Sequence, residues 1–138
     1  MTPFVDTNIL LYLTPLGFKE PDKRERALAI REGGCTISVQ VLNEFVNQAL
    51  RSVRNDAMPI GRLSELVETF RAFPIVALDL AVFDTALSLR QRVNYHWYDC
   101  LIVAAAITGG CDVLYSEDMQ HGRVIDGVRI ENPFRELA

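Results

Sequence analysis

Apolar residues along the chain form two kinds of pattern that alternate with one another. Residues 39–54 show the first, because their apolar side chains recur every three or four positions, as on one face of a helix. Short, continuous apolar runs show the second, which is typical of buried strands. This alternation predicts an α/β fold with a mainly parallel sheet covered by helices on both faces.

The predicted strands are short, and most are followed by a helix. We expect strands at residues 4–5, 35–38, 74–78, 111–115 and 128–130. We expect helices at residues 9–13, 19–31, 39–54, 60–73, 80–93 and 99–107. Ser38 and Asp79 are expected to be N-cap residues, and residues 94–98 are expected to form a polar and aromatic loop.

Two acidic residues fall where predicted strands end. Asp6 follows the strand at 4–5, and Asp118 lies just beyond the strand at 111–115. Parallel sheets bind ligands beyond the carboxyl ends of their strands. A carboxylate beside an apolar strand is costly unless another charge balances it. We therefore interpret Asp6 and Asp118 as candidate ligands of a cation.

Two further acids belong to predicted helices. Glu44 shares a polar helix face with Gln40, Asn47, Gln48 and Arg51, so it can line a cleft. Asp99 begins a helix whose other residues are nearly all apolar. The spacing of the four acids leaves open whether they meet.

The residue types favour a hard cation over zinc. Carboxylate oxygens are the ligands that Mg²⁺ and Mn²⁺ prefer. The two histidines, His96 and His121, have no second nitrogen or sulfur ligand at close helical spacing. Any metal site is therefore expected to use oxygen ligands alone.

The composition fits a globular chain that needs neither disulfide bonds nor a structural metal to be stable. Residues 1–138 are 49% hydrophobic, which is enough for the core of a single domain. The sequence has no apolar stretch of about 18 residues, and its start lacks the features of a secretory signal. We expect a soluble, cytoplasmic protein. The three cysteines, Cys35, Cys100 and Cys111, are widely spaced, so we interpret them as free structural thiols.

The net charge of -4 argues against a polyanionic partner, because nucleic-acid-binding proteins are usually basic. The four candidate ligands account for this charge, so the remaining ionisable groups sum to about zero. Bound divalent cations would neutralise the site itself. The charge is therefore compatible with a substrate that carries phosphates.

Each candidate also has a purely structural interpretation. Asp6 and Asp99 are suitable N-cap residues, and Glu44 suits a solvent-facing acid paired with Gln48 or Arg51. The aromatic residues before Asp99 suit base stacking, but they suit a core or an interface equally well. The scattered arginines suit a solvated surface.

Four acidic segments occur in an order that resembles the successive motifs of PIN domains. These segments are Phe-Val-Asp6-Thr-Asn-Ile, Glu44-Phe-Val, Trp-Tyr-Asp99-Cys-Leu-Ile-Val-Ala-Ala-Ala and Leu-Tyr-Ser116-Glu-Asp118-Met-Gln. These segments span nearly the whole chain. The sequence as a whole is similar to the VapC-type toxins of bacterial toxin–antitoxin pairs.

The resemblance implies a three-layer α/β/α fold and an endoribonuclease that hydrolyses RNA with Mg²⁺ or Mn²⁺. The family's catalytic residues and metal ligands would then be Asp6, Glu44, Asp99 and Asp118. Asn8 and Ser116 would support them. In the fourth motif the family pattern is Ser or Thr, any residue, then Asp. That pattern selects Asp118 and makes Glu117 a solvated neighbour.

The same resemblance implies three partners: an RNA substrate, a small cognate antitoxin that covers the cleft, and a second copy of the chain in a homodimer. Phe18, Phe70 and Phe73 are apolar candidates for such an interface.

Other protein classes with acids at strand ends fit less well. Phosphoaspartate enzymes of the haloacid-dehalogenase type and response-regulator receivers both use a lysine late in the chain. The only lysines here are Lys19 and Lys23. A catalytically silent PIN-like module that binds nucleic acid or a partner remains the alternative, and metal-dependent cleavage distinguishes it from the nuclease.

Overall fold

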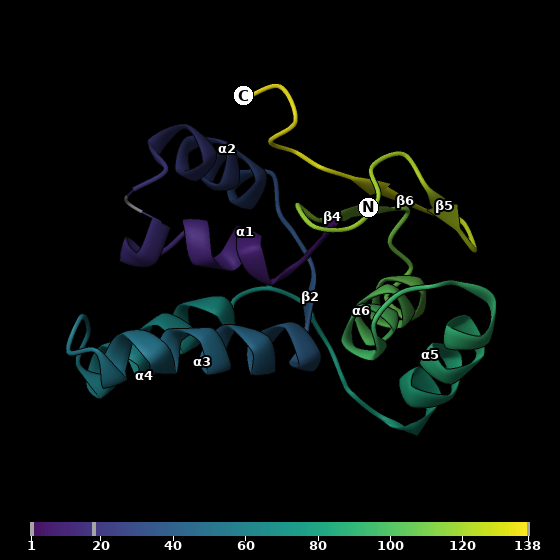
Figure 1. Cartoon of the computed structure of the whole chain (residues 1–138), viewed down its shortest axis with the longest axis horizontal. Coiled ribbons are helices and arrows are strands. Elements are labelled where there is room, and N and C mark those ends of the chain that lie inside the picture. The colour runs from purple at the N-terminus through teal and green to yellow at the C-terminus, as the bar shows by residue number, and fades with distance from the viewer. Residues whose placement is uncertain (1, 18, 138) are drawn as a thin grey trace.

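The structure is a computed structural model that describes residues 2–17 and 19–137. Its helices are α1 (Thr7–Tyr12), the 3₁₀ helix η1 (Pro15–Gly17), α2 (Pro21–Glu32), α3 (Val39–Arg54), α4 (Ile60–Phe70), α5 (Leu80–Arg92) and α6 (Trp97–Thr108). Its strands are β1 (Phe4–Val5), β2 (Ile37–Ser38), β3 (Ile75–Val76), β4 (Val113–Tyr115), β5 (Val124–Ile125) and β6 (Val128–Glu131). Figure 1 shows how these elements follow one another.

The predicted caps are confirmed at two helices. The Ser38 side chain accepts a hydrogen bond of 3.2 Å from Val41 N, and α3 spans the predicted residues 39–54. The Asp79 side chain accepts one of 3.0 Å from Val82 N at the start of α5. Such bonds satisfy backbone donors that the first turn of a helix leaves unpaired.

Several element boundaries differ from the predictions, and one strand was missed. Helix α6 begins at Trp97, so the predicted loop at 94–98 is wrong at its last two residues. Helix α4 ends at Phe70, three residues early. Strand β5 was not predicted, although it forms a hairpin with β6 through Asp126 and Gly127, whose φ angles are 47° and 85°. An Asp-Gly pair is a strong hairpin signal because both residues adopt positive φ readily.

The strands form a mixed sheet that is mainly parallel. The order is β1-β4-β6-β5, with β5 antiparallel to β6 and the other pairs parallel. Strands β2 and β3 form a second parallel pair. A parallel bridge between Phe4 and Thr36 links this pair to β1. The carboxyl ends of β1, β2 and β4 therefore lie near one edge, where ligands of α/β proteins bind.

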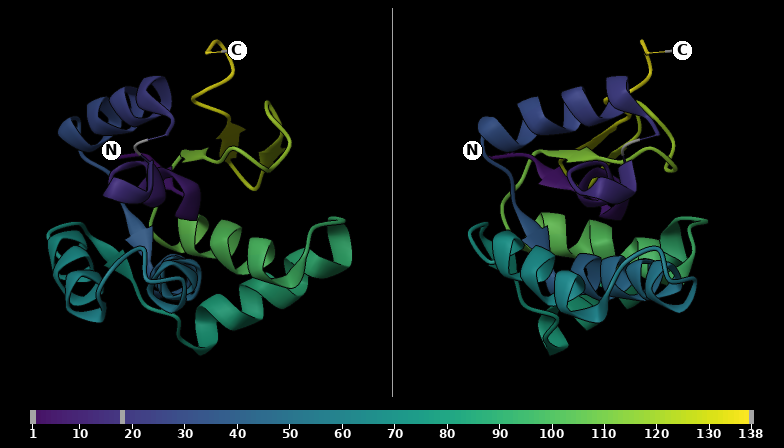
Figure 2. Two further views of the ribbon diagram at one scale, coloured as in Figure 1. Left: turned by 60° about the vertical axis from the view of Figure 1, so that its left-hand side comes forward. Right: turned by 90° about the vertical axis from the view of Figure 1, so that its left-hand side faces the viewer.

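Helices cover both faces of the sheet. Figure 2 shows α2 over one face, and α3, α4, α5 and α6 on the other. Helix α6 contacts β2, β3, β4 and β6, and residues 100–106 of this helix are buried, as expected for a central helix. Helix α1 contacts both α2 and α3 beside the sheet edge. The architecture is the expected three-layer α/β/α fold.

Aromatic side chains join α3 to α4. Phe45 and Phe70 meet edge to face with ring centroids 5.0 Å apart, and Phe73 stacks on Phe70 at 6.3 Å. Phe70 is buried, so the prediction that it suits an intermolecular interface is wrong, whereas Phe73 is half-buried against the core. Phe18 lies outside the described residues.

The three cysteines are free and buried, which confirms their interpretation as structural thiols. In the described part of the chain, none of the helices is long and apolar enough to cross a membrane.

Candidate active site

The pairing of β1 with β4 brings Asp6 next to Ser116. Val5 pairs with Tyr115, so the residues that follow them leave the sheet side by side. Ser116 Oγ donates a hydrogen bond of 2.8 Å to Asp6 Oδ2, and Thr7 N donates one of 2.6 Å to Asp6 Oδ1. Asp6 is the N-cap of α1 and only 8% exposed. The capping interpretation is thus confirmed, and it fixes this carboxylate at the sheet edge.

Asp118 is held beside Asp6 by residues of both strand ends. Asn8 Nδ2 donates a hydrogen bond of 2.9 Å to Asp118 Oδ2. Met119 N donates one of 3.3 Å to Ser116 Oγ, which stabilises the turn that carries Asp118. The two residues expected to support the acids, Asn8 and Ser116, therefore each contact one of them.

Asp99 lies in the first turn of α6, two residues after its start. The N-cap is His96, so the interpretation of Asp99 as a cap is wrong. Burial raises the pKa of Asp99, the charge of nearby His96 lowers it, and the charge of Asp118 raises it. This carboxylate is half-buried and within electrostatic range of Asp118.

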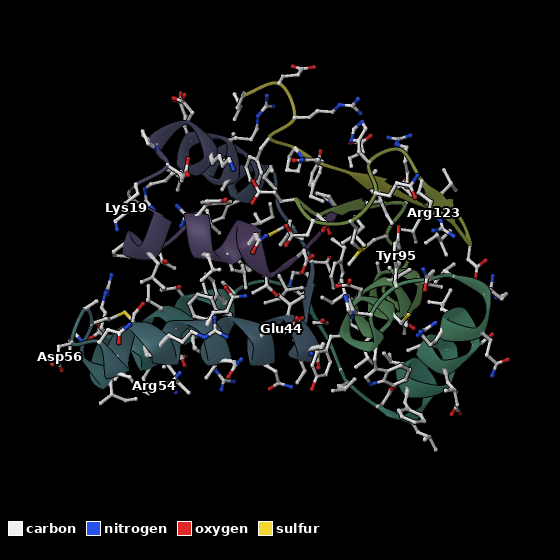
Figure 3. All side chains as sticks on the ribbon, viewed as in Figure 1. Lys19, Glu44, Arg54, Asp56, Tyr95 and Arg123 are labelled. Atoms are coloured by element: carbon white, nitrogen blue, oxygen red, sulfur yellow. The ribbon has the colours of Figure 1, made fainter. Side chains whose placement is uncertain are left out.

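Glu44 projects from α3 toward the same region. Figure 3 shows it on the side of α3 that faces α1. Burial, followed by the negative charges of Asp6 and Asp99, raises the pKa of Glu44 to about 7, although a hydrogen bond from Gln40 opposes this rise. Its Oε2 atom is buried and has no hydrogen-bond partner among the described residues. Glu44 is therefore not the solvent-facing acid of the alternative interpretation.

Burial and the charges of neighbouring acids raise the pKa values of Asp6, Glu44 and Asp99. The pKa of Asp6 is raised to about 6, mainly by burial and then by the charges of Asp99 and Asp118, against hydrogen bonds from Thr7 and Ser116 that lower it. Like charges and low solvent access both disfavour the ionised form. The structure thus brings the acids into one electrostatic site.

The acids do not form a closed set of ligands in this conformation. Across residues 2–17 and 19–137, no group of three His, Cys, Asp or Glu side chains is arranged to hold a metal ion. Mutual repulsion between carboxylates that share no cation favours such separation.

The residues present nevertheless fit a hard divalent cation. Within the described chain, three buried side-chain polar atoms lack a hydrogen-bond partner. One of them is Glu44 Oε2. An all-oxygen, anionic set with an unpaired buried oxygen suits Mg²⁺ or Mn²⁺ better than zinc.

Glu117 faces away from these acids. It forms an ion pair of 2.5 Å with Lys23 and accepts a hydrogen bond of 2.7 Å from Tyr12 Oη. The Lys23 ammonium lies 5.6 Å from the ring centroid of Tyr12 and 5.8 Å from that of Phe134. The prediction that Glu117 is merely solvated is therefore wrong, and this pairing leaves Asp118 as the acid that points toward Asn8.

An open pocket of about 660 Å³ adjoins the acids. Its lining comes mainly from the polar face of α3, and comprises Asn8, Gln40, Asn43, Glu44, Asn47, Gln48, Arg51, Tyr98 and Asp118. The sequence pattern had grouped most of the α3 residues on one face. It missed Asn43, whose spacing of four from Asn47 was the available signal, and it left the role of Tyr98 open.

Comparison with known proteins identifies the fold family. The model of the PIN domain family matches residues 4–126. No protein of curated function matches the chain by sequence. A chain of a toxin–antitoxin complex from Klebsiella pneumoniae superposes with a TM-score of 0.70 at 20% identity, over 96% of this chain and 98% of that one.

Two further structures are similar. VapBC2 from Rickettsia felis, bound to a DNA fragment from its promoter, gives a TM-score of 0.69 at 20% identity, over 96% of this chain and 98% of that one. VapC20 from Mycobacterium tuberculosis, a toxin that cleaves the sarcin-ricin loop, gives 0.63 at 17% identity, over 85% and 90%. These likenesses establish the fold, and the family model covers nearly all of the chain. This chain belongs to the PIN domain family.

Proposed function

We propose that this protein is a metal-dependent endoribonuclease and the toxin of a toxin–antitoxin pair. The observation that carries the proposal is the meeting of Asp6, Glu44, Asp99 and Asp118, from four separate segments, in one electrostatic site with an unpaired buried oxygen. Carboxylates whose pKa values are raised by burial and by neighbouring negative charges cluster at functional sites. The similarity to VapC toxins supports RNA as the substrate.

The four acids would hold Mg²⁺ or Mn²⁺. When bound, the cation would supply charge stabilisation at the scissile phosphate and activation of the attacking water. Thr7 N and Ser116 Oγ fix both oxygens of Asp6 at the sheet edge, while Asn8 orients Asp118. Because Asp6 and Glu44 have raised pKa values without a cation, binding of the cation would release protons.

A cleavage experiment tests this function. The parent should cut a mixed RNA pool with Mg²⁺ or Mn²⁺, and EDTA should stop the reaction. Asp99→Asn should lower the rate by at least about 100-fold, because it removes one ligand charge. Asp112→Asn is the matched control, since Asp112 is an exposed carboxylate outside the site.

The alternative function makes the opposite prediction. A folded, antitoxin-free parent that cuts no RNA with either metal would support a catalytically silent module that binds nucleic acid or a partner.

We also propose a small cognate antitoxin as a partner, because several similar structures are toxin–antitoxin complexes. Expression of this chain alone should arrest bacterial growth, and co-expression of the antitoxin should restore it. Growth unaffected by the active, soluble chain would contradict the toxin assignment.

We also propose that the protein forms a homodimer and that α5 provides the interface. Leu80, Phe83 and Leu87 are 72%, 43% and 46% exposed and recur at helical spacing, so they form one apolar stripe. Exposed stripes of this kind mark interaction surfaces. Light scattering should give the mass of a dimer for the parent and of a monomer for Phe83→Glu. A monomeric parent at micromolar concentration would count against the dimer.

A further inference from the structure

The pocket beside the acids has a second wall with a different chemistry. Asn43, Asn47 and Arg51 follow one another at intervals of four residues on α3, and all three are exposed. Across the pocket, α6 contributes Tyr98, which is 58% exposed. This wall adjoins the catalytic candidates directly, because Glu44 and Asp118 line the same pocket.

Tyr98 differs from its neighbour Trp97 in its packing. Trp97 is half-buried and meets Phe83 edge to face, with ring centroids 5.5 Å apart. Among the described residues, no other aromatic ring packs on Tyr98. The core therefore accounts for Trp97, whereas the ring of Tyr98 is presented to the pocket and the solvent.

The chemistry of this wall matches a nucleobase. Each asparagine amide offers both a donor and an acceptor, as the edge of a base requires. An exposed tyrosine ring provides a stacking surface for any base. Arg51 is the cation of the lining and suits a phosphate. The pocket volume of about 660 Å³ lies in the range of about 300–1,000 Å³ that is usual for small-ligand sites.

We propose that this wall is a subsite for one unpaired nucleotide of the substrate, beside the bond that is cut. Tyr98 stacks on the base, Asn43 and Asn47 contact its edge, and Arg51 binds a neighbouring phosphate. The base must be unpaired, because pairing and stacking within a duplex cover the edge and the faces that these side chains would contact. The inference rests on the proposed function and assigns the residues that hold one nucleotide of its substrate.

Steady-state cleavage of a short single-stranded RNA with Mn²⁺ tests the subsite. Tyr98→Ala should raise KM by about 10-fold or more, the effect of losing one stacked base. Tyr98→Phe keeps the ring and should behave like the parent. Asn47→Ala should change the base preference at the cut site in a random-sequence library. The same RNA paired with its complement should be cut much more slowly.

Two controls separate this subsite from the metal site. All three variants should keep the melting temperature of the parent and its shift with Mn²⁺, since none of the substituted residues is an acid of the site. Unchanged KM and base preference in Tyr98→Ala and Asn47→Ala, with metal-dependent cleavage intact, would overturn the subsite and leave the nuclease standing.

A parent that does not cleave still permits the test. Fluorescence anisotropy would then measure binding of the labelled single-stranded RNA, and Tyr98→Ala must weaken that binding relative to Tyr98→Phe. An absence of binding by the parent would overturn the subsite. Inhibition by the antitoxin that depends on Tyr98, with unchanged RNA kinetics, would also overturn it and identify a protein-docking surface instead.

Discussion

Without metal ions, the protein is expected to lose stability as the pH rises from about 4 to about 7, and Asp6→Asn is expected to remove much of this loss. The pKa of Asp6 is 3.8 in the unfolded reference and about 6 in the folded chain. That of Glu44 is 4.5 in the reference and about 7 in the fold. Both folded-state values are raised, mainly by burial, so folding favours the protonated carboxyls.

The sign of the effect follows from proton linkage. Between the unfolded and folded pKa values, the folded chain binds more protons than the unfolded chain, so the free energy of unfolding falls as pH rises. The loss is complete above the folded pKa values. For Asp6 alone, the difference between 3.8 and about 6 corresponds to about 3 kcal/mol as an order of magnitude.

Urea unfolding in EDTA at acidic and at mildly alkaline pH measures this loss. The midpoint of the parent should be clearly lower at alkaline pH. Asp6→Asn should reduce the difference, because an asparagine side chain still accepts the capping bond from Thr7 N but carries no charge. Asp112→Asn should keep the pH dependence of the parent. A parent that is equally stable, or more stable, at alkaline pH would contradict the arrangement of the acids.

Millimolar Mn²⁺ or Mg²⁺ should raise the melting temperature of the parent. A ligand that binds only the folded state at 100 times its Kd adds about 2.7 kcal/mol to the free energy of unfolding. For a chain of this size, that corresponds to a shift of about 10 °C. The shift should be larger above pH 7 than at pH 5, because protons compete for Asp6 and Glu44 at the lower pH.

Differential scanning fluorimetry with Asp99→Asn distinguishes specific binding from a general effect of salt. The variant should lose most of the shift with Mn²⁺, and Asp112→Asn should keep it. NaCl at matched ionic strength should reproduce little of the shift, because it screens repulsion without bridging the carboxylates. The absence of a shift with either metal would contradict the assignment of the four acids as ligands.

Some corrections to the predictions arose from local signals that were present in the sequence. Asp126-Gly127 lies between Val124-Ile125 and Val128-Arg129-Ile130, which is the pattern of the β5–β6 hairpin that was missed. Helix α6 begins at Trp97 because His96 serves as its N-cap, although no side-chain bond from His96 marks that position. Capping without a side-chain acceptor leaves little trace in a sequence.

The sequence by itself determined the order of the strands and helices apart from β5, the caps at Ser38 and Asp79, and the placement of Asp6 and Asp118 at strand ends. These features depend on residues within a few positions of one another, where periodicity and capping act. Only the tertiary structure decided that Glu44 faces Asp6 and Asp99, that Glu117 pairs with Lys23, and that Phe70 is buried in the core. Each of these contacts joins segments far apart in the chain, so it depends on how helices pack around the sheet, which local patterns do not encode.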